Sequence, residues 1–254
     1  MPLEVASLML AADGTPMSEA YSDIYYASAG GHAQARHVFL AGNGLPVRWQ
    51  DRACFTILET GFGLGLNFLA TWLAWRDDSQ RCQELHFISL EKHPLVNADL
   101  ALAHAAWPEL DDLAAALRRR WPPLVAGTHR LEFEGGRLIL TLIFADAVEA
   151  LPTLVAAVDG FYLDGFSPAR NPELWSAALC RSLARLAVPG ASLATWSVAG
   201  SVRRALLAAG FAVEKRGGFA HKRQMLVGRY APDFPTANLP AFRAGKVDAQ
   251  GDRT

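Results

Sequence analysis

The chain has 254 residues, of which 51% are hydrophobic and 19% are charged, and its formal net charge is -1. This balance is typical of a globular protein and excludes a disordered chain. No apolar run approaches the ~18 residues that a membrane-spanning helix needs, and the first residues lack the basic and apolar stretches of a secretory signal. We therefore expect a cytoplasmic protein with no membrane association.

The positions of cysteine and histidine give no sign of a disulfide framework or a metal site. The three cysteines, Cys54, Cys82 and Cys180, lie far apart, and no pair has the C-x-x-C spacing. The seven histidines are not at the spacing of metal ligands either. We expect reduced thiols in the core and no bound metal.

From Cys54 onward, strand-like and helix-like segments alternate, which predicts an α/β fold with a mostly parallel sheet covered by helices. The expected strands are residues 55–59, 84–91, 129–133, 137–144, 159–164 and 191–196. The expected helices are residues 64–76, 95–106, 110–119, 173–187 and 201–209. Gly135-Gly136 predicts the turn of a hairpin, and Pro189-Gly190 predicts a turn before the strand at 191–196.

The chain changes character on both sides of this region. Residues 211–217 and 222–230 have the pattern of two strands, and the segment between them is too short for a helical crossover, so they should pair antiparallel. Such a terminal hairpin separates the expected architecture from the ordinary dinucleotide-binding fold. Residues 1–50 are expected to pack on the core as an extension, with short strands at 23–28 and 37–43. Residues 51–230 form the main domain, and 231–254 have the composition of a linker or tail.

A glycine-rich turn, ETGFGLGLN, follows the first strand of the main domain and precedes a helix. Glycines here let a ligand approach the backbone and the helix N-terminus closely. The spacing differs from the G-x-G-x-x-G of dinucleotide sites, and an acid just before the first glycine would repel a pyrophosphate. S-adenosylmethionine, which carries a sulfonium and an ammonium group, fits that charge; a purely structural turn is the alternative. The candidate donor-binding residues in this stretch are Glu59, Gly61, Phe62, Gly63, Gly65 and Asn67.

Two further acids follow expected strands. Glu91 ends the strand at 84–91, where a carboxylate can accept hydrogen bonds from ribose hydroxyls, and Lys92 follows it. A surface glutamate is the alternative. Asp146 follows the strand at 137–144, where it and the N–H of Ala147 are placed to bind adenine; alternatively, Asp146 caps the next helix. We assign all four residues to the expected donor site.

The stretch FYLDGFSPARNP carries the candidate catalytic residue, Asp164, at the end of the next strand. Ligands bind at the carboxyl ends of strands in open α/β sheets. The run D-G-F-x-P also resembles the D/N-P-P-Y/F motif with which amino-methyltransferases hold an acceptor nitrogen. A turn-forming Asp-Gly is the alternative, but it leaves Phe166 and Pro168 unexplained. A carboxylate of pKa ~4 is too weak a base to deprotonate an alkylammonium, so Asp164 is expected to orient an amine and stabilise the charge that its nitrogen gains.

Aromatic and basic residues are candidates for contacts with the acceptor. Tyr25, Tyr26 and Phe166 are suited to stacking on a flat base. Positive charge is concentrated late in the chain, which indicates an anionic docking face or simply a solvated cluster. The positive residues are Arg203, Arg204, Lys215, Arg216, Lys222, Arg223 and Arg229.

With these residues in view, the chain resembles the methyltransferase domain of the MnmC family, which completes 5-methylaminomethyl-2-thiouridine at the wobble position of bacterial tRNA. The resemblance runs over nearly the whole chain, through DGTPMSEAYSDIYY, ETGFGLGLNFL, LHFISLEKHPL, DLALAHAAWPEL, FYLDGFSPARNPELW, LATWSVAGSVRRALLAAGF and KRGGFAHKRQML. It implies a Rossmann-like class I S-adenosylmethionine-dependent methyltransferase fold, with Asp164 as the catalytic aspartate. It also implies that tRNA, through its anticodon stem-loop, is the partner. The basic segment 215–223, with Phe219, Lys222 and Arg223, is the expected rim on that side.

Members of the MnmC family carry an FAD-dependent oxidase in their C-terminal half. No second glycine-rich fingerprint follows Tyr230, so we expect neither oxidase activity nor FAD in this chain. The chain is then either a stand-alone methyltransferase or a fragment of a bifunctional enzyme, and the composition after Tyr230 favours the fragment.

Two other functions fit parts of the pattern. A polyamine-type aminopropyl- or methyltransferase would share an aspartate at a strand end but needs a compact acidic pocket. The positive residues between Arg203 and Arg229 argue against such a pocket. A non-catalytic RNA-binding module would keep the fold and lose the donor site.

Overall fold

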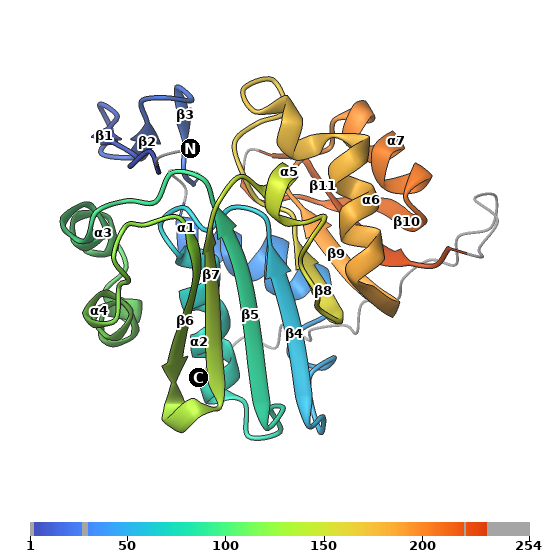
Figure 1. The fold of residues 1–254 in the computed structure, drawn as a ribbon, viewed down its shortest axis with the longest axis horizontal. Coiled ribbons are helices and arrows are strands. Elements are labelled where there is room, and N and C mark those ends of the chain that lie inside the picture. The colour runs from blue at the N-terminus through green and yellow to red at the C-terminus, as the bar shows by residue number, and fades with distance from the viewer. Residues whose placement is uncertain (1–2, 27–29, 221, 233–254) are drawn as a thin grey trace, which may run out of the picture.

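The computed structural model describes residues 3–26, 30–220 and 222–232, and its centre is one eight-stranded sheet. The sheet has the order β10-β11-β9-β8-β4-β5-β7-β6 (Figure 1). Its strands are β4 (Cys54–Glu59), β5 (Glu84–Glu91), β6 (Gly127–Phe133), β7 (Leu138–Phe144), β8 (Val158–Tyr162), β9 (Ala187–Thr195), β10 (Phe211–Gly217) and β11 (Gln224–Tyr230).

The middle of the sheet is parallel and both edges are antiparallel. Strand β4 pairs parallel with β5 and β8, and these pair parallel with β7 and β9. At one edge β6 pairs antiparallel with β7; at the other, β11 pairs antiparallel with both β9 and β10. Gly135 and Gly136 both have positive φ, at 69° and 85°, which suits the turn between β6 and β7. Both expected hairpins are therefore confirmed.

Helices cover both faces of the sheet (Figure 1). Consecutive side chains of a strand point to opposite faces, so Ile57 and Leu58 of β4 belong to two separate apolar clusters. The first cluster lies under the helices α1 to α4, and the second under α5 to α7. The helices are α1 (Gly31–Ala35), α2 (Leu66–Asp77), α3 (Asn97–His104), α4 (Asp111–Arg119), α5 (Ala147–Ala150), α6 (Ala177–Leu186) and α7 (Gly200–Ala208).

The N-terminal segment is less regular, and one expectation for it is wrong. Strands β1 (Leu8–Leu10), β2 (Pro16–Ser18) and β3 (Asp23–Ile24) form a small separate sheet. The expected strand at 23–28 is limited to β3, and residues 27–28 lie outside the described residues. Residues 37–43, expected as a strand, are helical instead, in η1 (Arg36–Leu40) and η2 (Ala41–Asn43). The run Val38, Phe39, Leu40 is buried, and a short buried apolar run does not distinguish a strand from a helix.

Other boundaries differ in detail. The expected helix at 173–187 is divided into η5 (Pro172–Trp175) and α6, because Ser176 accepts a hydrogen bond from the Leu179 N–H and caps α6. The turn expected at Pro189-Gly190 lies inside β9, where the pairing with β8 changes register between Val158 and Gly160. The expected linker lies outside the described residues from 233 onward.

Within the described residues, no helix is both long and apolar enough to cross a bilayer. The same residues contain no group of three or more His, Cys, Asp or Glu side chains placed to hold a metal ion.

Arg48 fastens the helical N-terminal segment to the start of the strands. Its guanidinium donates to the carbonyl oxygens of Asp159 (3.1 Å), Gly190 (3.3 Å) and Asn43 (3.4 Å), and to the Ser192 hydroxyl. The Asn43 side chain is fully buried and accepts a hydrogen bond from the same hydroxyl at 2.6 Å. Removing the guanidinium would leave buried carbonyl groups without a donor.

We expect Arg48→Met to lower the free energy of unfolding by about 2–4 kcal/mol, because buried acceptors that lose their donor keep their desolvation cost. Chemical denaturation monitored by circular dichroism measures this change. Arg36→Met, on the exposed side of η1, is the matched control and should change the free energy by less than ~0.5 kcal/mol. Equal effects of the two substitutions would contradict the proposed anchoring role.

Candidate active site

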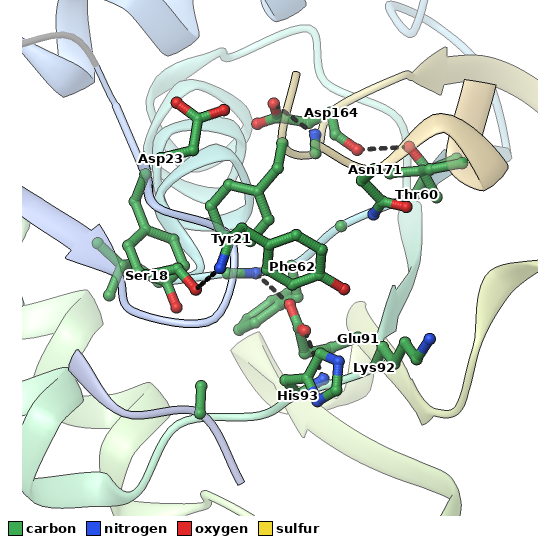
Figure 2. A pocket seen from close by; sticks show the side chains of 18 of the residues that line it. Ser18, Tyr21, Asp23, Thr60, Phe62, Glu91, Lys92, His93, Asp164 and Asn171 are labelled. Carbon is green, nitrogen blue, oxygen red and sulfur yellow. Dashed lines mark hydrogen bonds between the residues drawn. The ribbon is translucent and has the colours of Figure 1, made fainter. Parts of the chain in front are cut away.

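A cavity of about 400 Å³ lies at the carboxyl ends of the parallel strands. Its walls come from the loops after β4, β5, β7, β8 and β9, from the N-terminal segment before α2, and from the β10–β11 loop. Figure 2 shows Asp164 and Thr60 at one end of the cavity, and Glu91, Lys92 and His93 at the other. The strand ends therefore bring distant acids to one space, as the topology of an open α/β sheet dictates.

The glycine-rich turn packs so tightly that side chains do not fit. A Cβ atom on Gly61 would lie 3.1 Å from the Asp164 carbonyl oxygen, and one on Gly63 would lie 3.2 Å from the Tyr25 ring. Gly63 and Gly65 have φ of 52° and 74°, in the left-handed region, and a Cβ on Gly65 would lie 2.7 Å from Phe62. Gly61, Phe62 and Gly63 line the cavity, whereas Gly65 lies behind Phe62 at the N-cap of α2.

Glu91 is hydrogen-bonded to the glycine-rich turn. Its Oε2 accepts a hydrogen bond from the Gly63 N–H at 2.7 Å, and its Oε1 accepts one from the His93 N–H at 2.8 Å. Burial raises the pKa of Glu91, and these backbone hydrogen bonds act in the opposite direction. Each oxygen keeps a further lone pair that a ligand hydroxyl can use.

Asp146 caps a helix and also lines the cavity. It caps α5, because its Oδ1 accepts a hydrogen bond from the Val148 N–H at 2.8 Å. It also lines the cavity beside Ala147 and forms an ion pair with Lys92 at 2.9 Å. Burial alone would raise the pKa of Asp146, but its bonds to Lys92 and Val148 bring it below the ordinary value.

Glu59 does not line the cavity but lies beneath it. The side chain is 0% exposed, and its carboxyl accepts hydrogen bonds from Asn67 Nδ2 at 2.9 Å and Ser89 Oγ at 2.7 Å. Burial raises the pKa of Glu59 well above the ordinary value, and the nearby Asp164 raises it further. Glu59 is therefore connected to the cavity through Asn67, which lines it.

Asp164 is held by N–H donors from three parts of the chain. Its Oδ2 accepts from Asn67 Nδ2 at 2.7 Å, and its Oδ1 accepts from the Gly165 N–H at 2.9 Å and from Trp196 Nε1 at 3.1 Å. The Thr60 hydroxyl donates to the Asp164 carbonyl at 2.7 Å and fixes the backbone. Burial raises the pKa of Asp164, whereas these donors and the Lys222 charge favour the ionised form.

An aromatic wall stands beside Asp164. Phe166 stacks on Tyr21 with ring centroids 4.4 Å apart and meets Tyr25 edge-on at 5.4 Å. Tyr26 lines the same cavity and contacts the Trp107 ring at 5.4 Å. Pro168 does not line the cavity and belongs to the turn, which is tied to β3 by the Ser167 N–H donating to Asp23 at 3.0 Å.

Of the expected basic rim, one residue reaches the cavity. Lys222 lines it, with its ammonium 3.4 Å from the centre of the Trp196 ring. Phe219 and Arg223 lie outside the lining, and Phe219 contacts the His37 ring at 6.1 Å.

Four further residues line the cavity that were not among the candidates from the sequence: Thr60, Tyr21, Asp23 and Trp196. Trp196 directly follows β9, so its position at a strand end was a usable signal. Thr60 lies within the glycine-rich turn ETGFGLGLN, next to the candidates Glu59 and Gly61. Tyr21 and Asp23 carry no such signal, because only the folded N-terminal segment brings them to the cavity.

Comparison with known proteins gives consistent matches. A family model described as S-adenosyl-L-methionine-dependent methyltransferase matches residues 108–231. The tRNA 5-methylaminomethyl-2-thiouridine biosynthesis bifunctional protein MnmC of Aromatoleum aromaticum is 59% identical over 97% of this chain, which covers 38% of that protein. The protein of the same name from Azoarcus sp. is 61% identical over 91% of this chain, which covers 36% of that protein. The chain thus spans less than two fifths of these relatives.

The solved structure of MnmC2 from Aquifex aeolicus has the same fold, with a TM-score of 0.71 and 24% identity over 93% of this chain and 73% of that one.

We expect Glu59→Gln to flatten the pH dependence of stability. The pKa of Glu59 is raised in the folded state, so its contribution to the free energy of unfolding is fully present at pH values below its pKa in the unfolded chain. That contribution is lost as the pH rises through its pKa in the folded protein. The wild-type free energy of unfolding should therefore fall more than that of the variant as pH rises from 5 to 8, as measured by urea denaturation. Exposed Glu149→Gln is the control, and a variant curve parallel to wild type would exclude a buried, protonated Glu59.

Proposed function

Because the chain belongs to the MnmC family and is the methyltransferase part of its members, we propose that it methylates the amino nitrogen of 5-aminomethyl-2-thiouridine at the tRNA wobble position. The product is 5-methylaminomethyl-2-thiouridine, and the methyl donor is S-adenosyl-L-methionine. The observation that carries this proposal is the Asp164 carboxylate, fixed by three N–H donors beside the close-packed glycine turn.

The cavity fits this donor by shape and by charge. A side chain on Gly61 or Gly63 would crowd the Asp164 carbonyl oxygen or the Tyr25 ring, and both neighbours belong to residues that line the cavity. Among the described lining residues, carboxylates outnumber cationic side chains, which suits a ligand bearing a sulfonium and an ammonium. When bound, the donor supplies a methyl group on a positively charged sulfur. The acidic lining residues are Glu4, Glu19, Asp23, Glu91, Asp146 and Asp164.

Each end of the cavity has its own task in this proposal. Glu91 accepts hydrogen bonds from the ribose hydroxyls, and Asp146 with the Ala147 N–H holds the adenine. Asp164 orients the acceptor amine and stabilises the positive charge that its nitrogen gains. The three N–H donors keep the Asp164 carboxylate in place and favour its ionised form, although burial opposes ionisation.

The aromatic wall would hold the acceptor base. Tyr21 already covers one face of Phe166, so a base has the remaining surface of Tyr25, Tyr26 and Phe166 to stack against. Pro168 contributes by stiffening the turn.

The anticodon stem-loop would approach from the β10–β11 loop, where Phe219 and Arg223 lie outside the cavity. We further propose that an FAD-dependent oxidase domain is the physical partner, as the bifunctional relatives suggest, and that this chain itself uses no FAD. A cytoplasmic location follows from a tRNA substrate.

If Asp164 has the proposed role, removing its carboxyl group should slow methyl transfer while leaving the affinity for the donor nearly unchanged. Asp164→Ala should lower the rate of methyl transfer to tRNA bearing 5-aminomethyl-2-thiouridine by about 10²-fold or more, because the developing charge on nitrogen loses its partner. Isothermal titration should show donor affinity within a few-fold of wild type. Asp112→Ala, exposed on α4, is the control for both measurements. Collapse of donor binding in Asp164→Ala would contradict this division of roles, and no transfer by intact wild-type protein would overturn the proposed function.

The acidic lining would also suit a free polyamine, so a second prediction separates the two substrates. If tRNA is the substrate, its affinity should fall steeply with salt, because phosphate contacts release counterions. Binding measured between 50 and 200 mM salt should weaken by about 10-fold or more. A polyamine-type transferase would instead bind tRNA weakly at every salt concentration and methylate or aminopropylate spermidine.

A further inference from the structure

The acceptor end of the cavity already contains an amine that belongs to the chain. Lys222 lies in the β10–β11 loop, and its ammonium is 3.4 Å from the centre of the Trp196 ring. The same ring donates its Nε1–H to Asp164 Oδ1 at 3.1 Å. The ammonium therefore lies on the face of the ring whose edge holds the proposed catalytic carboxylate.

Three features make this a site for an amine. The face of an indole ring attracts cations, most strongly where water is excluded. The carboxylates of Asp164 and Asp23 both exert a favourable electrostatic effect on the Lys222 ammonium. Within the described lining, the other lysine, Lys92, is paired with Asp146 and does not compensate these two acids.

The Lys222 side chain can leave this position without a change in the backbone. Its loop is fixed by backbone hydrogen bonds from the Gly218 N–H to the Arg223 carbonyl (3.1 Å) and from the Lys222 N–H to the Phe219 carbonyl (3.0 Å). The four-carbon lysine chain can swing away without moving this backbone. Partial desolvation lowers the pKa of Lys222 while Asp164 and Asp23 raise it, and the residue as a whole is exposed, so its ammonium can pass from the ring face to water.

We propose that the Trp196 ring face, with the carboxylates of Asp164 and Asp23, is the binding site for the aminomethyl group of the acceptor, and that the Lys222 ammonium occupies this site until the acceptor displaces it. The inference rests on the proposed function and adds an amine-recognition site and an internal competitor to it. Lys222 then acts by leaving the site, rather than by holding a phosphate. The Trp196 ring selects an amine over an uncharged methyl group.

Lysine labelling tests the displacement directly, without turnover. Intact protein is treated with trace acetic anhydride, and mass spectrometry compares the acetylation rate of Lys222 with that of Lys215 on β10. Both residues are exposed, so the comparison reports the contact of the Lys222 ammonium with the Trp196 ring rather than burial. We expect Lys222 to react several-fold more slowly than Lys215 in the free protein. Its rate should rise several-fold on addition of the nucleoside 5-aminomethyl-2-thiouridine, and should not rise with 5-methyl-2-thiouridine. Equal rates in the free protein, or a Lys222 rate that falls with the amine nucleoside, would overturn the proposal.

Affinity measurements give a second test. Lys222→Met should bind 5-aminomethyl-2-thiouridine about 3- to 10-fold more tightly than wild type, because the competing amine is gone. Lys215→Met should bind as wild type does. Trp196→Leu should lose about 10-fold in affinity, whereas Trp196→Phe, which keeps a ring face, should lose less. Unchanged or weaker binding by Lys222→Met, or equal losses in the two Trp196 variants, would contradict the proposal.

The displacement of Lys222 and the proposed methyl transfer can be tested independently of each other. If wild-type protein methylates the modified tRNA but Lys222→Met binds the nucleoside no more tightly, the displacement is wrong and the proposed function stands. If wild-type protein transfers no methyl group while the amine nucleoside still exposes Lys222, the amine site stands and the proposed reaction is wrong.

Discussion

The arrangement of the cavity depends on one side-chain amide. Asn67 Nδ2 has two hydrogens, and it donates one to Glu59 at 2.9 Å and one to Asp164 at 2.7 Å. Burial makes ionisation of both carboxyl groups expensive at this spacing, and Glu59 is the more deeply enclosed of the two. The Asn67 amide joins the two carboxyl groups, with Glu59 beneath the cavity and Asp164 lining it. The position of the Asp164 carboxyl group is thereby set from beneath the cavity.

This arrangement depends on both the sheet and the segments that cover it. Parallel strands bring the acids to one edge, and Asn67 reaches Asp164 from the first turn of α2. The N-terminal segment supplies the opposite wall through Tyr21 and Tyr25, and Asp23 ties it to the turn after β8. Arg48 fastens the following helical segment to the far ends of β8 and β9. One short stretch of chain is therefore anchored at both ends of the sheet.

Much of this was predictable from the sequence, and the reasons are local. The strands, the two hairpins and the positions of Asp164, Glu91 and Asp146 follow from alternation and from strand ends. The helical form of 37–43 was not predictable, because consecutive buried apolar residues carry no period. Nor was the position of Glu59, since its depth depends on Ser89 of a neighbouring strand and on Asn67 of a helix. Tyr21 and Asp23 reach the cavity only through tertiary packing.

The donors that hold Asp164 are far apart in the chain. Asn67 lies 97 residues before it and Trp196 lies 32 residues after it. A fragment of the chain that lacks Asn67 or Trp196 cannot hold the Asp164 carboxylate in this orientation. Catalytic turnover is therefore a sensitive reporter of long-range order: a substitution deep in α2 or β9, remote from any ligand, would first appear as a kinetic defect in a protein whose spectra still look native.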